Sequence, residues 1–408
     1  MARVLVKLKQ ASVRRGMRTV FENMDIEIRQ GDVRILIGTN GSGKSTLIET
    51  LLGLIPLEKG NLEHNESFVL DSDGRSKKSM LDIGVALQSN GMMGSETVAE
   101  HLEYATMMYG KRIDVSPFLE AFSLLHRKHD LVATLSAGQQ RKVAVLAALL
   151  PAFASDVPTV VALDEPDAGL DEPTIAILVK WIRHLSDAGH GIVISSHQGV
   201  FSKVATHVHS MDTNKVEVHE PISFKKMDDF PQSETKKRLS ASTFGLRQQV
   251  RTMRWLSHNG MAALMTLGVF MAILPQPIGS DSIEHLGFML APALAIGLCG
   301  DGLVVMLREE RSLSWWKATA NTTPHSSWLP FALGCIMTLL SSSVLAGVES
   351  LSVELVLSGT MLAGCLAHIM RFIQLQVEQL ARPHAVFIGL LTPILILPFA
   401  LLLEVLAA

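Results

Sequence analysis

The spacing of apolar residues changes in character partway along the chain. Near the start, Val4, Val6 and Leu8 alternate with polar residues, which predicts a strand. Apolar runs of strand length follow at 33–37, 81–87, 160–163 and 192–195, and helix-like stretches lie at 44–52 and 96–109. Strands that alternate with helices are typical of a sheet covered on both faces. The pattern therefore predicts an α/β domain over residues 1–215.

The last part of the chain consists of long apolar stretches. Five stretches of about 20 residues lie near 259–278, 286–306, 328–348, 351–370 and 385–406. Each is long enough to cross roughly 30 Å of hydrocarbon as a helix. We expect an all-α transmembrane domain over residues 255–408, with about five helices. Because five is an odd number, a re-entrant stretch or a sixth span stays open.

The charges between these stretches indicate their orientation. The polar segment 216–254 and the connections at 307–327 and 371–384 contain lysine or arginine, whereas the connections at 279–285 and 347–354 contain acidic residues and neither lysine nor arginine. Basic loops of membrane proteins stay on the cytoplasmic side. We therefore expect a basic juxtamembrane linker at 216–254, the N-terminus inside, and a multi-pass protein of the cytoplasmic (inner) membrane.

Composition adds few further constraints. A chain of 408 residues suits two domains, and a mean hydropathy of +0.29 averages a soluble region with an apolar one. The net charge of −3, without a basic stripe, gives no indication of nucleic-acid binding. The first ten residues lack the apolar core of a secretion signal, so we expect the first domain to stay in the cytosol. Cys299, Cys335 and Cys365 fall in apolar segments without CxxC spacing, which predicts packing residues.

A glycine-rich motif joins the apolar run 33–37 to the helix-like stretch that follows. It matches the phosphate-loop pattern G-x-x-x-x-G-K-[ST] with Gly38, Thr39, Asn40, Gly41, Ser42, Gly43, Lys44 and Ser45. Glycines let backbone N–H groups close around phosphates, and the helix N-terminus adds its positive end. We expect Lys44 to reach the phosphates of ATP, Ser45 to ligate Mg²⁺, and Thr46 to help bind the nucleotide. The strand and helix on either side disfavour a chance glycine turn.

Two carboxylates end the apolar run 160–163. Asp164 and Glu165 would lie at the carboxyl edge of the sheet, where ligands of open α/β sheets bind. We expect Asp164 to hold Mg²⁺ and Glu165 to act as the general base that polarises the attacking water. An exposed acidic turn is the alternative, and the phosphate loop upstream makes it the weaker one.

Further motifs follow in a characteristic order. They are Gln88 at the end of a strand, a segment Leu135-Ser136-Ala137-Gly138-Gln139, a segment Asp167-Ala168-Gly169-Leu170-Asp171, and His197 after the run 192–196. Together with the phosphate loop, this set resembles the ATP-binding-cassette family over residues 1 to about 212. Gln88 or His197 alone would more often be structural, but their order and context favour a functional role.

The resemblance implies a site shared between two cassettes. In the family, two copies pack head to tail, so that ATP held by the phosphate loop of one is covered by the other. Here the covering residues would be Ser136, Gly138 and Gln139. The chain has one phosphate loop and one such segment, so the implied partner is a second copy or a paralogous half-transporter.

The resemblance also assigns roles to Gln88 and His197. His197 would contact the γ-phosphate, and Gln88 would ligate the metal and couple it to the helical subdomain. Two positions depart from the family pattern. Arg15 stands where an aromatic residue usually stacks on adenine, so stacking would fall to its planar guanidinium. Asp167 replaces a small hydroxyl residue, which affects the geometry expected across the dimer.

The membrane region is similar to exporter-type permeases, in which a short charged helix after the second span sits on the ATPase. The segment from Leu307 to Pro324 fits that element. The compact ATPase half and Arg382-Pro383 before the last span also resemble the haem exporter of cytochrome c maturation, although a sixth span is missing and two usually separate chains are fused. His368, His285 and the pair Trp315-Trp316 are candidate haem contacts, but a structural histidine and a membrane-interface tryptophan anchor are the simpler interpretations.

Three functions remain in competition. The first is an ATP-hydrolysing half-transporter that exports a substrate, with haem or a cytochrome c maturation factor as the candidate cargo and a drug or lipid as alternatives. The second is a membrane-anchored ATPase that transmits force or a signal to a partner. The third, a soluble ATPase with a buried apolar helical core, conflicts with the sided distribution of lysine and arginine.

Overall fold

The computed structural model describes residues 2–196, 199–222, 234–236, 238, 240–274, 283–320, 323–377, 385–394 and 396. The chain divides into two compact units. Unit 1 comprises Met1–Leu239 and Glu310–Thr323, and unit 2 comprises Ser240–Glu309 and Pro324–Ala408. The chain therefore leaves unit 1, returns to it for one short segment, and leaves again.

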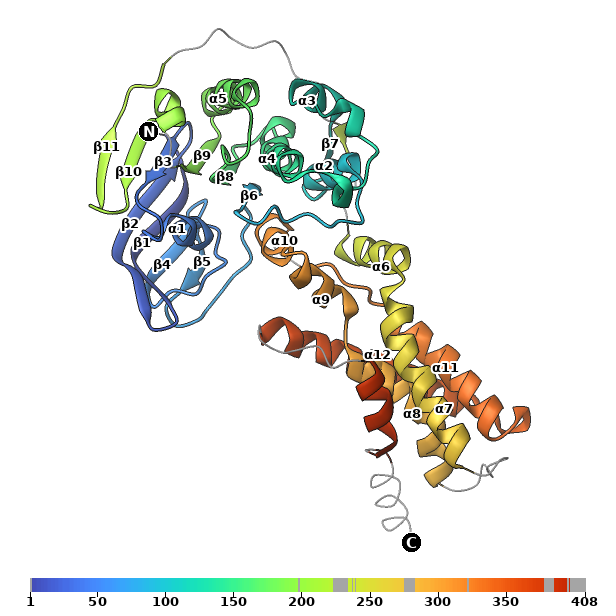
Figure 1. Ribbon diagram of the computed structural model, residues 1–408. Coiled ribbons are helices and arrows are strands. Elements are labelled where there is room, and N and C mark those ends of the chain that lie inside the picture. The colour runs from blue at the N-terminus through green and yellow to red at the C-terminus, as the bar shows by residue number, and fades with distance from the viewer. Residues whose placement is uncertain are drawn as a thin grey trace. The chain divides into compact units, whose positions relative to one another are not determined.

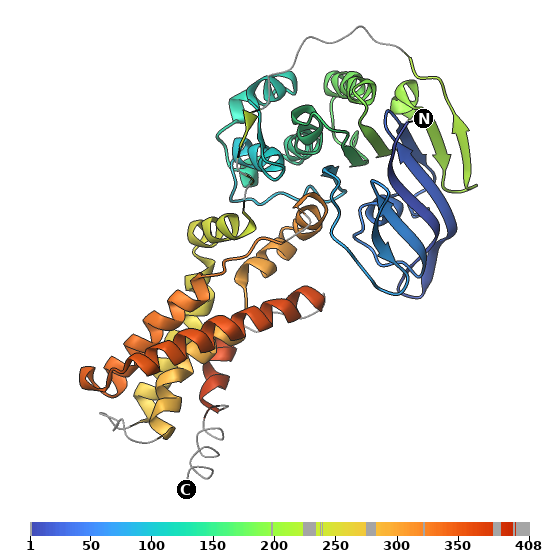
Figure 2. The same cartoon turned by 180° about the vertical axis from the view of Figure 1, so that it is seen from behind.

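The strands of unit 1 form two main sheets within the described ranges (Figure 1). They are β1 (Val4–Arg15), β2 (Arg18–Arg29), β3 (Val33–Ile37), β4 (Lys59–His64), β5 (Ser67–Asp71), β6 (Ile83–Ala86), β8 (Val160–Asp164), β9 (Gly191–Ser195), β10 (His207–Ser210) and β11 (Lys215–Val218). The antiparallel sheet has the order β2-β1-β4-β5 and forms one blue layer in Figure 2. The other sheet has the order β11-β10-β3-β9-β8-β6 and is parallel from β10 to β6.

Burial explains why the parallel strands are apolar along their whole length. Every residue of β6, β8 and β9 is buried, because helices cover both faces of a parallel sheet. The helices of unit 1 are α1 (Lys44–Leu51), α2 (Val98–Met107), α3 (Ser116–Ala121), α4 (Ala137–Ala154), α5 (Glu172–Asp187) and α10 (Leu313–Ala320). The short 3-10 turns Leu125–Arg127, Val132–Thr134 and Gly199–Val204 lie between them, and β7 (Lys111–Arg112) pairs with β12 (Glu234–Thr235). The expected α/β fold is confirmed.

An aromatic cluster ties α5 to the neighbouring helices. The Trp181 ring of α5 stacks on Phe122 with centroids 5.1 Å apart, and it meets Phe118 and Phe153 edge-on at 5.6 Å each. Such aromatic pairs contribute about 1 kcal/mol each beyond the area they bury. The cluster thereby fixes α5 against α3 and α4.

The segment 310–323 packs on unit 1 through α10, as expected for the charged element of the exporter resemblance. The Trp315 and His101 ring centroids are 5.0 Å apart. The Gly94 amide donates to Glu310 Oε2 at 2.8 Å, and the Tyr109 hydroxyl lies 2.6 Å from the Thr319 carbonyl oxygen. The membrane-anchor interpretation of Trp315 and Trp316 is wrong, since their exposed fractions in the folded chain are only 2% and 1%.

The described secondary-structure elements of unit 2 are all helices or helical turns. Its elements are α6 (Ala241–Thr252), a π-helical turn (Leu256–Gly260), α7 (Met261–Ile273), α8 (Ile283–Cys299), α9 (Gly302–Glu309), α11 (Leu329–Leu345), a 3-10 turn (Val348–Ser350), α12 (Val353–Gln376) and a helix at Ala385–Ile394. Helix α6 lies within the range 216–254 and belongs to this unit.

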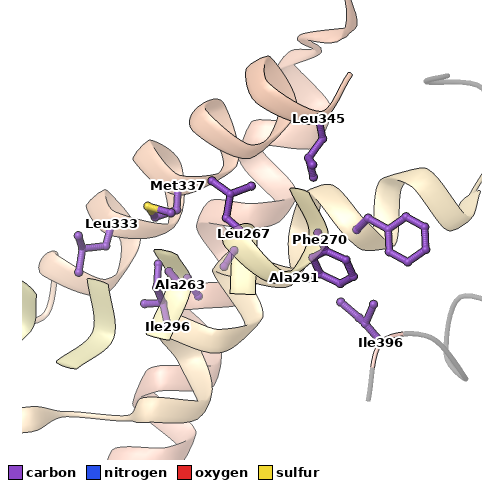
Figure 3. Close-up of a cluster of buried hydrophobic side chains, with 12 residues drawn as sticks. Ala263, Leu267, Phe270, Ala291, Ile296, Leu333, Met337, Leu345 and Ile396 are labelled. Carbon is purple, nitrogen blue, oxygen red and sulfur yellow. The ribbon is translucent and has the colours of Figure 1, made fainter. Parts of the chain in front are cut away.

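Helices α7, α8, α11 and α12 pack around a buried cluster. Phe270 and Phe288 meet at a centroid distance of 5.1 Å, and Leu267, Met337 and Ile396 join them (Figure 3). Small residues let α11 and α12 approach closely, as in membrane helix pairs. A Cβ atom at Gly359 would lie 1.9 Å from Thr338 Oγ1, so no larger residue fits at this crossing.

Three described helices are long and apolar enough to cross a membrane: Leu256–Ile273, His285–Glu309 and Val353–Gln376. The helices Leu329–Leu345 and Ala385–Ile394 are apolar but shorter. They coincide with the third and fifth predicted spans. The end of the fifth span, and the Arg382-Pro383 pair before it, lie outside the described residues. Of the cysteines expected to be packing residues, Cys299 is buried, Cys335 half-buried and Cys365 exposed.

The second predicted span is interrupted near its end. Gly300 has a φ of 66°, which separates α8 from α9 and places Asp301 at the break. The Asp301 carboxylate pairs with Arg371 Nε at 3.3 Å and accepts from Gln249 Nε2 at 2.8 Å. Asp301 therefore faces the helix bundle, where its charge is compensated.

We predict that Gly84→Ala destabilises unit 1. The new Cβ atom would lie 1.8 Å from the Ala148 carbonyl oxygen of α4, so β6 and α4 must move apart. Overpacking of this kind costs about 3 kcal/mol, measurable as a lower melting temperature of the detergent-solubilised chain. Gly199→Ala is the control, because its nearest contact would be an ordinary 3.4 Å. Equal melting temperatures for both variants would contradict the close contact.

Candidate functional site

The phosphate loop connects β3 to α1 as its sequence predicts. Gly43 caps α1 with a φ of 103°, and a Cβ atom there would lie 2.7 Å from Val20 Cγ1, so only glycine fits. The first turn of α1 contains no acidic residue. Its free N–H groups and the positive end of the helix are therefore left for an anion.

Lys44 is folded over this loop. Its Nζ donates to the carbonyl oxygens of Gly38 at 2.8 Å and Thr39 at 3.0 Å. Thr39 is itself fixed by Asp212, whose carboxylate accepts from the Thr39 amide at 3.0 Å and from its hydroxyl at 2.9 Å. Within the described ranges, the buried Ser42 Oγ has no hydrogen-bond partner. An unpaired hydroxyl in the phosphate loop suits a phosphate oxygen.

Two carboxylates and one hydroxyl meet where β8 and β9 end. Ser195 Oγ donates to Asp164 Oδ1 at 2.5 Å and accepts from the Glu165 amide at 2.9 Å. Glu165 has a φ of 51°, an unfavourable conformation for a residue other than glycine, of a kind that clusters at functional sites. Ser195 therefore holds the Asp164 carboxylate and the Glu165 backbone together, a role that the sequence did not indicate.

A cleft of about 610 Å³ brings part of the predicted phosphate loop together with Arg15, Gln88 and Glu165. Its walls consist of Arg15, Arg18, Val20, Asn40, Gly41, Gly43, Lys44, Ser45, Thr46, Gln88 and Glu165. A second cleft of about 230 Å³ is lined by Asp164, Glu165 and Gln88 together with Gly138 and its neighbours. Arg18 and Val20 were missed by the sequence analysis because the cleft wall they form depends on tertiary structure.

The metal ligands expected from the sequence suit Mg²⁺ chemically. Ser45 and Gln88 line the larger cleft, and Asp164 and Gln88 line the smaller one. The described residues contain no group of three or more His, Cys, Asp or Glu side chains that could hold a metal alone. Mg²⁺ is usually bound by one or two protein ligands plus substrate phosphates, so a sparse set of oxygen donors fits it.

Arg15 lies in the larger cleft but is not free there. Its guanidinium pairs with the carboxylate of Glu49. Burial raises the pKa of Glu49, and the charge of Arg15 opposes this shift. Stacking of Arg15 on adenine remains a prediction, and it would have to coexist with this ion pair.

The predicted covering segment begins α4. The Ser136 hydroxyl accepts from the Gln139 amide at 3.3 Å, and Gln139 Oε1 accepts from the Ser136 amide at 3.0 Å, which forms a capping box. Ser136 is exposed and Gly138 is partly exposed. The segment is thus a preformed helix start that is accessible within this chain.

Arg141, one turn further along α4, connects three parts of the site. Its guanidinium donates to the carbonyl oxygens of Leu87 and Asp164 and to Asn90 Oδ1. Burial lowers the pKa of Arg141, and the charges of the acidic residues around Asp164 oppose that shift. Arg141 follows the covering segment directly in sequence, but only the fold shows which carbonyl groups it contacts.

The segment after Glu165 is also fixed by side chains. Asp167 Oδ2 accepts from Ser196 Oγ at 3.2 Å. Asp171 caps α5 and pairs with Lys142 Nζ at 2.6 Å, which lowers the pKa of Asp171 to about 2. His197, expected to contact the γ-phosphate, lies outside the described residues.

Comparison with known proteins agrees with this geometry. The family model described as ABC transporter matches residues 21–168. The chain is 30% identical over 220 residues to the glutamate/aspartate import ATP-binding protein GltL of Escherichia coli strain K12, covering 52% of this chain and 89% of that protein. It is 32% identical over 198 residues to the cytochrome c biogenesis ATP-binding export protein CcmA of Idiomarina loihiensis, covering 48% of this chain and 87% of that protein.

Other relatives are matched over less of their length. The chain is 29% identical over 185 residues to an uncharacterized ABC transporter ATP-binding protein of Rhizobium meliloti, covering 44% of this chain and 66% of that protein. The Fe(3+) ions import ATP-binding protein FbpC of Fusobacterium nucleatum is matched over only 44% of its own length, and the linearmycin resistance ATP-binding protein LnrL of Bacillus subtilis over only 58%. Among solved structures, an ATP binding subunit of an ABC transporter is 26% identical, with a TM-score of 0.44, covering 50% of this chain and 85% of that one.

We predict that Ser195→Ala slows ATP hydrolysis. Without the hydroxyl, Asp164 Oδ1 and the Glu165 amide lose a shared partner, and hydrogen bonds to charged groups are worth about 1.5–3 kcal/mol. We expect kcat to fall by about tenfold or more while KM for ATP changes little. Ser186→Ala is the control, because it removes a buried hydroxyl that bonds Gly31 elsewhere in unit 1. A similar loss in both variants would point to general destabilisation.

Proposed function

Because the chain belongs to the ABC transporter family and its unit 1 contains an ABC ATPase domain, we propose that it is an ATP-hydrolysing half-transporter that exports a substrate across the cytoplasmic membrane. The observation that carries the proposal is the cleft in which Lys44, Ser45 and Glu165 meet, within a chain that also has membrane-length helices.

The geometry of the cleft suggests a division of roles in hydrolysis. The loop amides, Lys44 and the helix N-terminus bind the phosphates, and Ser45, Gln88 and Asp164 are the residues that would hold Mg²⁺. When bound, Mg²⁺ supplies charge neutralisation at the phosphate oxygens. Glu165, held by Ser195, orients the attacking water and accepts its proton. His197 follows Ser195 and Ser196 along the chain and is proposed as the γ-phosphate contact.

Efficient hydrolysis requires a second cassette under this proposal. The larger cleft contains the phosphate loop but no residue of the segment 135–139. The exposed start of α4 would instead cover the nucleotide of a second copy, or of a paralogous half-transporter, with Ser136, Gly138 and Gln139. In this arrangement each chain contributes the phosphate loop to one nucleotide site and the covering segment to the other.

The membrane half is proposed to respond to the nucleotide through α10. Gln88 lines both clefts and follows β6, and α10 packs on β6 within unit 1. A change at the nucleotide can thus reach the segment that connects two apolar helices of unit 2. The proposed site of action is the cytoplasmic membrane, with the ATPase domain on the cytosolic side and several passes through the bilayer.

The cargo is a finer question, and haem is the first candidate. Its support is the similarity to proteins named for cytochrome c biogenesis export, at 30% and 32% identity. Proteins named for glutamate/aspartate import and for Fe(3+) import are equally similar, at 30% each. A drug or lipid exporter, and a membrane-anchored ATPase that transmits force to a partner, remain the alternatives to test.

We predict that Glu165→Gln traps ATP. The amide cannot accept a proton from water, and loss of a general base costs about 100-fold or more in rate. The variant, reconstituted in nanodiscs, should retain bound ATP while releasing almost no phosphate. Glu172→Gln serves as the control, because Glu172 is an exposed residue at the start of α5. Hydrolysis at the unmodified rate in Glu165→Gln would refute the assignment of the base.

We further predict that the cargo stimulates hydrolysis in liposomes. An exported substrate should bind one state of the transporter better than the other and so accelerate the cycle. Haem, a set of phospholipids and a set of hydrophobic drugs would be compared at equal concentrations, with Glu165→Gln as the background. Stimulation by haem alone supports haem export. A response to a partner protein but to no small molecule would favour the force-transmitting alternative.

A further inference from the structure

A third pocket in unit 1 belongs to none of the proposed catalytic steps. Its volume is about 440 Å³, and it lies between the end of α1, strand β5 and α10. The lining residues are Leu52, Gly53, Leu54, Val69, Leu70, Ser76, Lys77, Lys78, Ser79, Ile83, Lys317, Ala318 and Thr323. All belong to unit 1, although Lys317 is far from Lys77 in sequence.

The charge of this pocket is entirely positive. Lys77, Lys78 and Lys317 line it, and no aspartate or glutamate does. Within the described part of the chain, none of these three lysines forms an ion pair. The acidic residues in the turn before them are already occupied, because Arg75 pairs with Asp71 at 2.7 Å and with Asp73 at 3.0 Å. Three uncompensated ammonium groups around one cavity favour an anion.

Part of the remaining wall is apolar, beside the polar residues Ser76, Ser79 and Thr323. Leu52, Leu54, Val69 and Ile83 supply aliphatic surface beside the lysines. A small inorganic anion would leave this surface uncovered, whereas a molecule with both a phosphate group and a hydrocarbon part would use both kinds of wall. The chemistry of the pocket therefore fits an anionic amphiphile.

Chain connectivity indicates where such a molecule would come from. Only Glu310, Arg311 and Ser312 separate α10 from the end of the membrane-length helical stretch His285–Glu309, which consists of α8 and α9 on either side of the break at Gly300. Three residues and their links reach about 14 Å at most, so α10 stays near the end of that helix in any arrangement of the two units. If that helix spans a bilayer as proposed above, lipid headgroups are available close to α10.

We propose that this pocket binds the headgroup of an anionic phospholipid, held by Lys77, Lys78 and Lys317. The inference rests on the proposed membrane location but not on ATP hydrolysis. The pocket also touches Leu52, just beyond the last residue of α1, and α1 begins at Lys44 of the phosphate loop. An acidic lipid bound here contacts both α10 and the far end of the nucleotide-binding helix.

The test is a titration of the detergent-solubilised full chain with short-chain phosphatidylglycerol. Binding is followed by tryptophan fluorescence, because Trp315 and Trp316 lie next to Lys317 in α10. The variant Lys77→Gln/Lys78→Gln/Lys317→Gln should bind about tenfold or more weakly, since each lysine near an anionic lipid surface contributes roughly a fivefold change in affinity.

The matched control is Lys59→Gln/Lys180→Gln/Lys215→Gln. It removes the same charge from three exposed lysines of unit 1 that do not line the pocket. Retained binding in this control, together with no binding of short-chain phosphatidylcholine, supports the proposal. Equal weakening in both triple variants, or unchanged binding in the pocket variant, overturns it.

Two further measurements complete the test. The first distinguishes a lipid from a soluble phosphate compound, and the second separates the lipid site from the catalytic function. If glycerol 3-phosphate binds as tightly as phosphatidylglycerol, the ligand is a soluble phosphate compound and the lipid assignment fails. ATP hydrolysis is measured on the same samples. Absent hydrolysis with selective loss of lipid binding in the pocket variant would reject the proposed function and keep the lipid site. Normal hydrolysis with unchanged lipid binding in the pocket variant would keep the proposed function and reject the lipid site.

Discussion

The register of three neighbouring parallel strands determines the geometry of the nucleotide site. Ser195 at the end of β9 pairs across the sheet with Leu36 of β3 on one side and with Asp164 of β8 on the other. Backbone hydrogen bonds therefore hold the strand that leads into the phosphate loop level with the strand that ends in the carboxylates. Because a shift of one residue would move every side chain to the opposite face, this register also keeps Lys44 and Glu165 around one cleft.

The parts of the site that sequence could predict are those that depend on a short contiguous pattern. Lys44 follows from glycines at fixed spacing, and Asp164 follows from an apolar run that ends in two acids. Ser195 and Arg141 could not be predicted in the same way, since their roles depend on groups distant in sequence: the carboxylate of Asp164, the amide of Glu165 and the carbonyl of Leu87. Arg15 was found by its position, but its pairing with Glu49 required the fold.

The apolar helical unit shows the same limit. Hydropathy located the apolar helices that the structure describes, because burial in lipid and burial in protein both select apolar residues. It did not reveal the break at Gly300, which depends on the backbone of one glycine, or the pairing of Asp301 with Arg371. It also suggested a lipid interface for Trp315 and Trp316, although both rings are buried in the folded chain. A tryptophan pair between apolar helices gives the same local sequence pattern whether it lies at a lipid interface or in the core of a protein.

The return of residues 310–323 to unit 1 affects the order in which the two units can fold during synthesis. A ribosome completes residues 1–239 well before α10 exists, so the surface around Gly91, His101 and Tyr109 has no cover at that stage. The cassette can reach its final packing only after the helices up to Glu309 have been synthesised and the chain has returned. Domains usually fold in the order in which they are translated. In this protein the order is interleaved, and the last piece of the first unit arrives after much of the second.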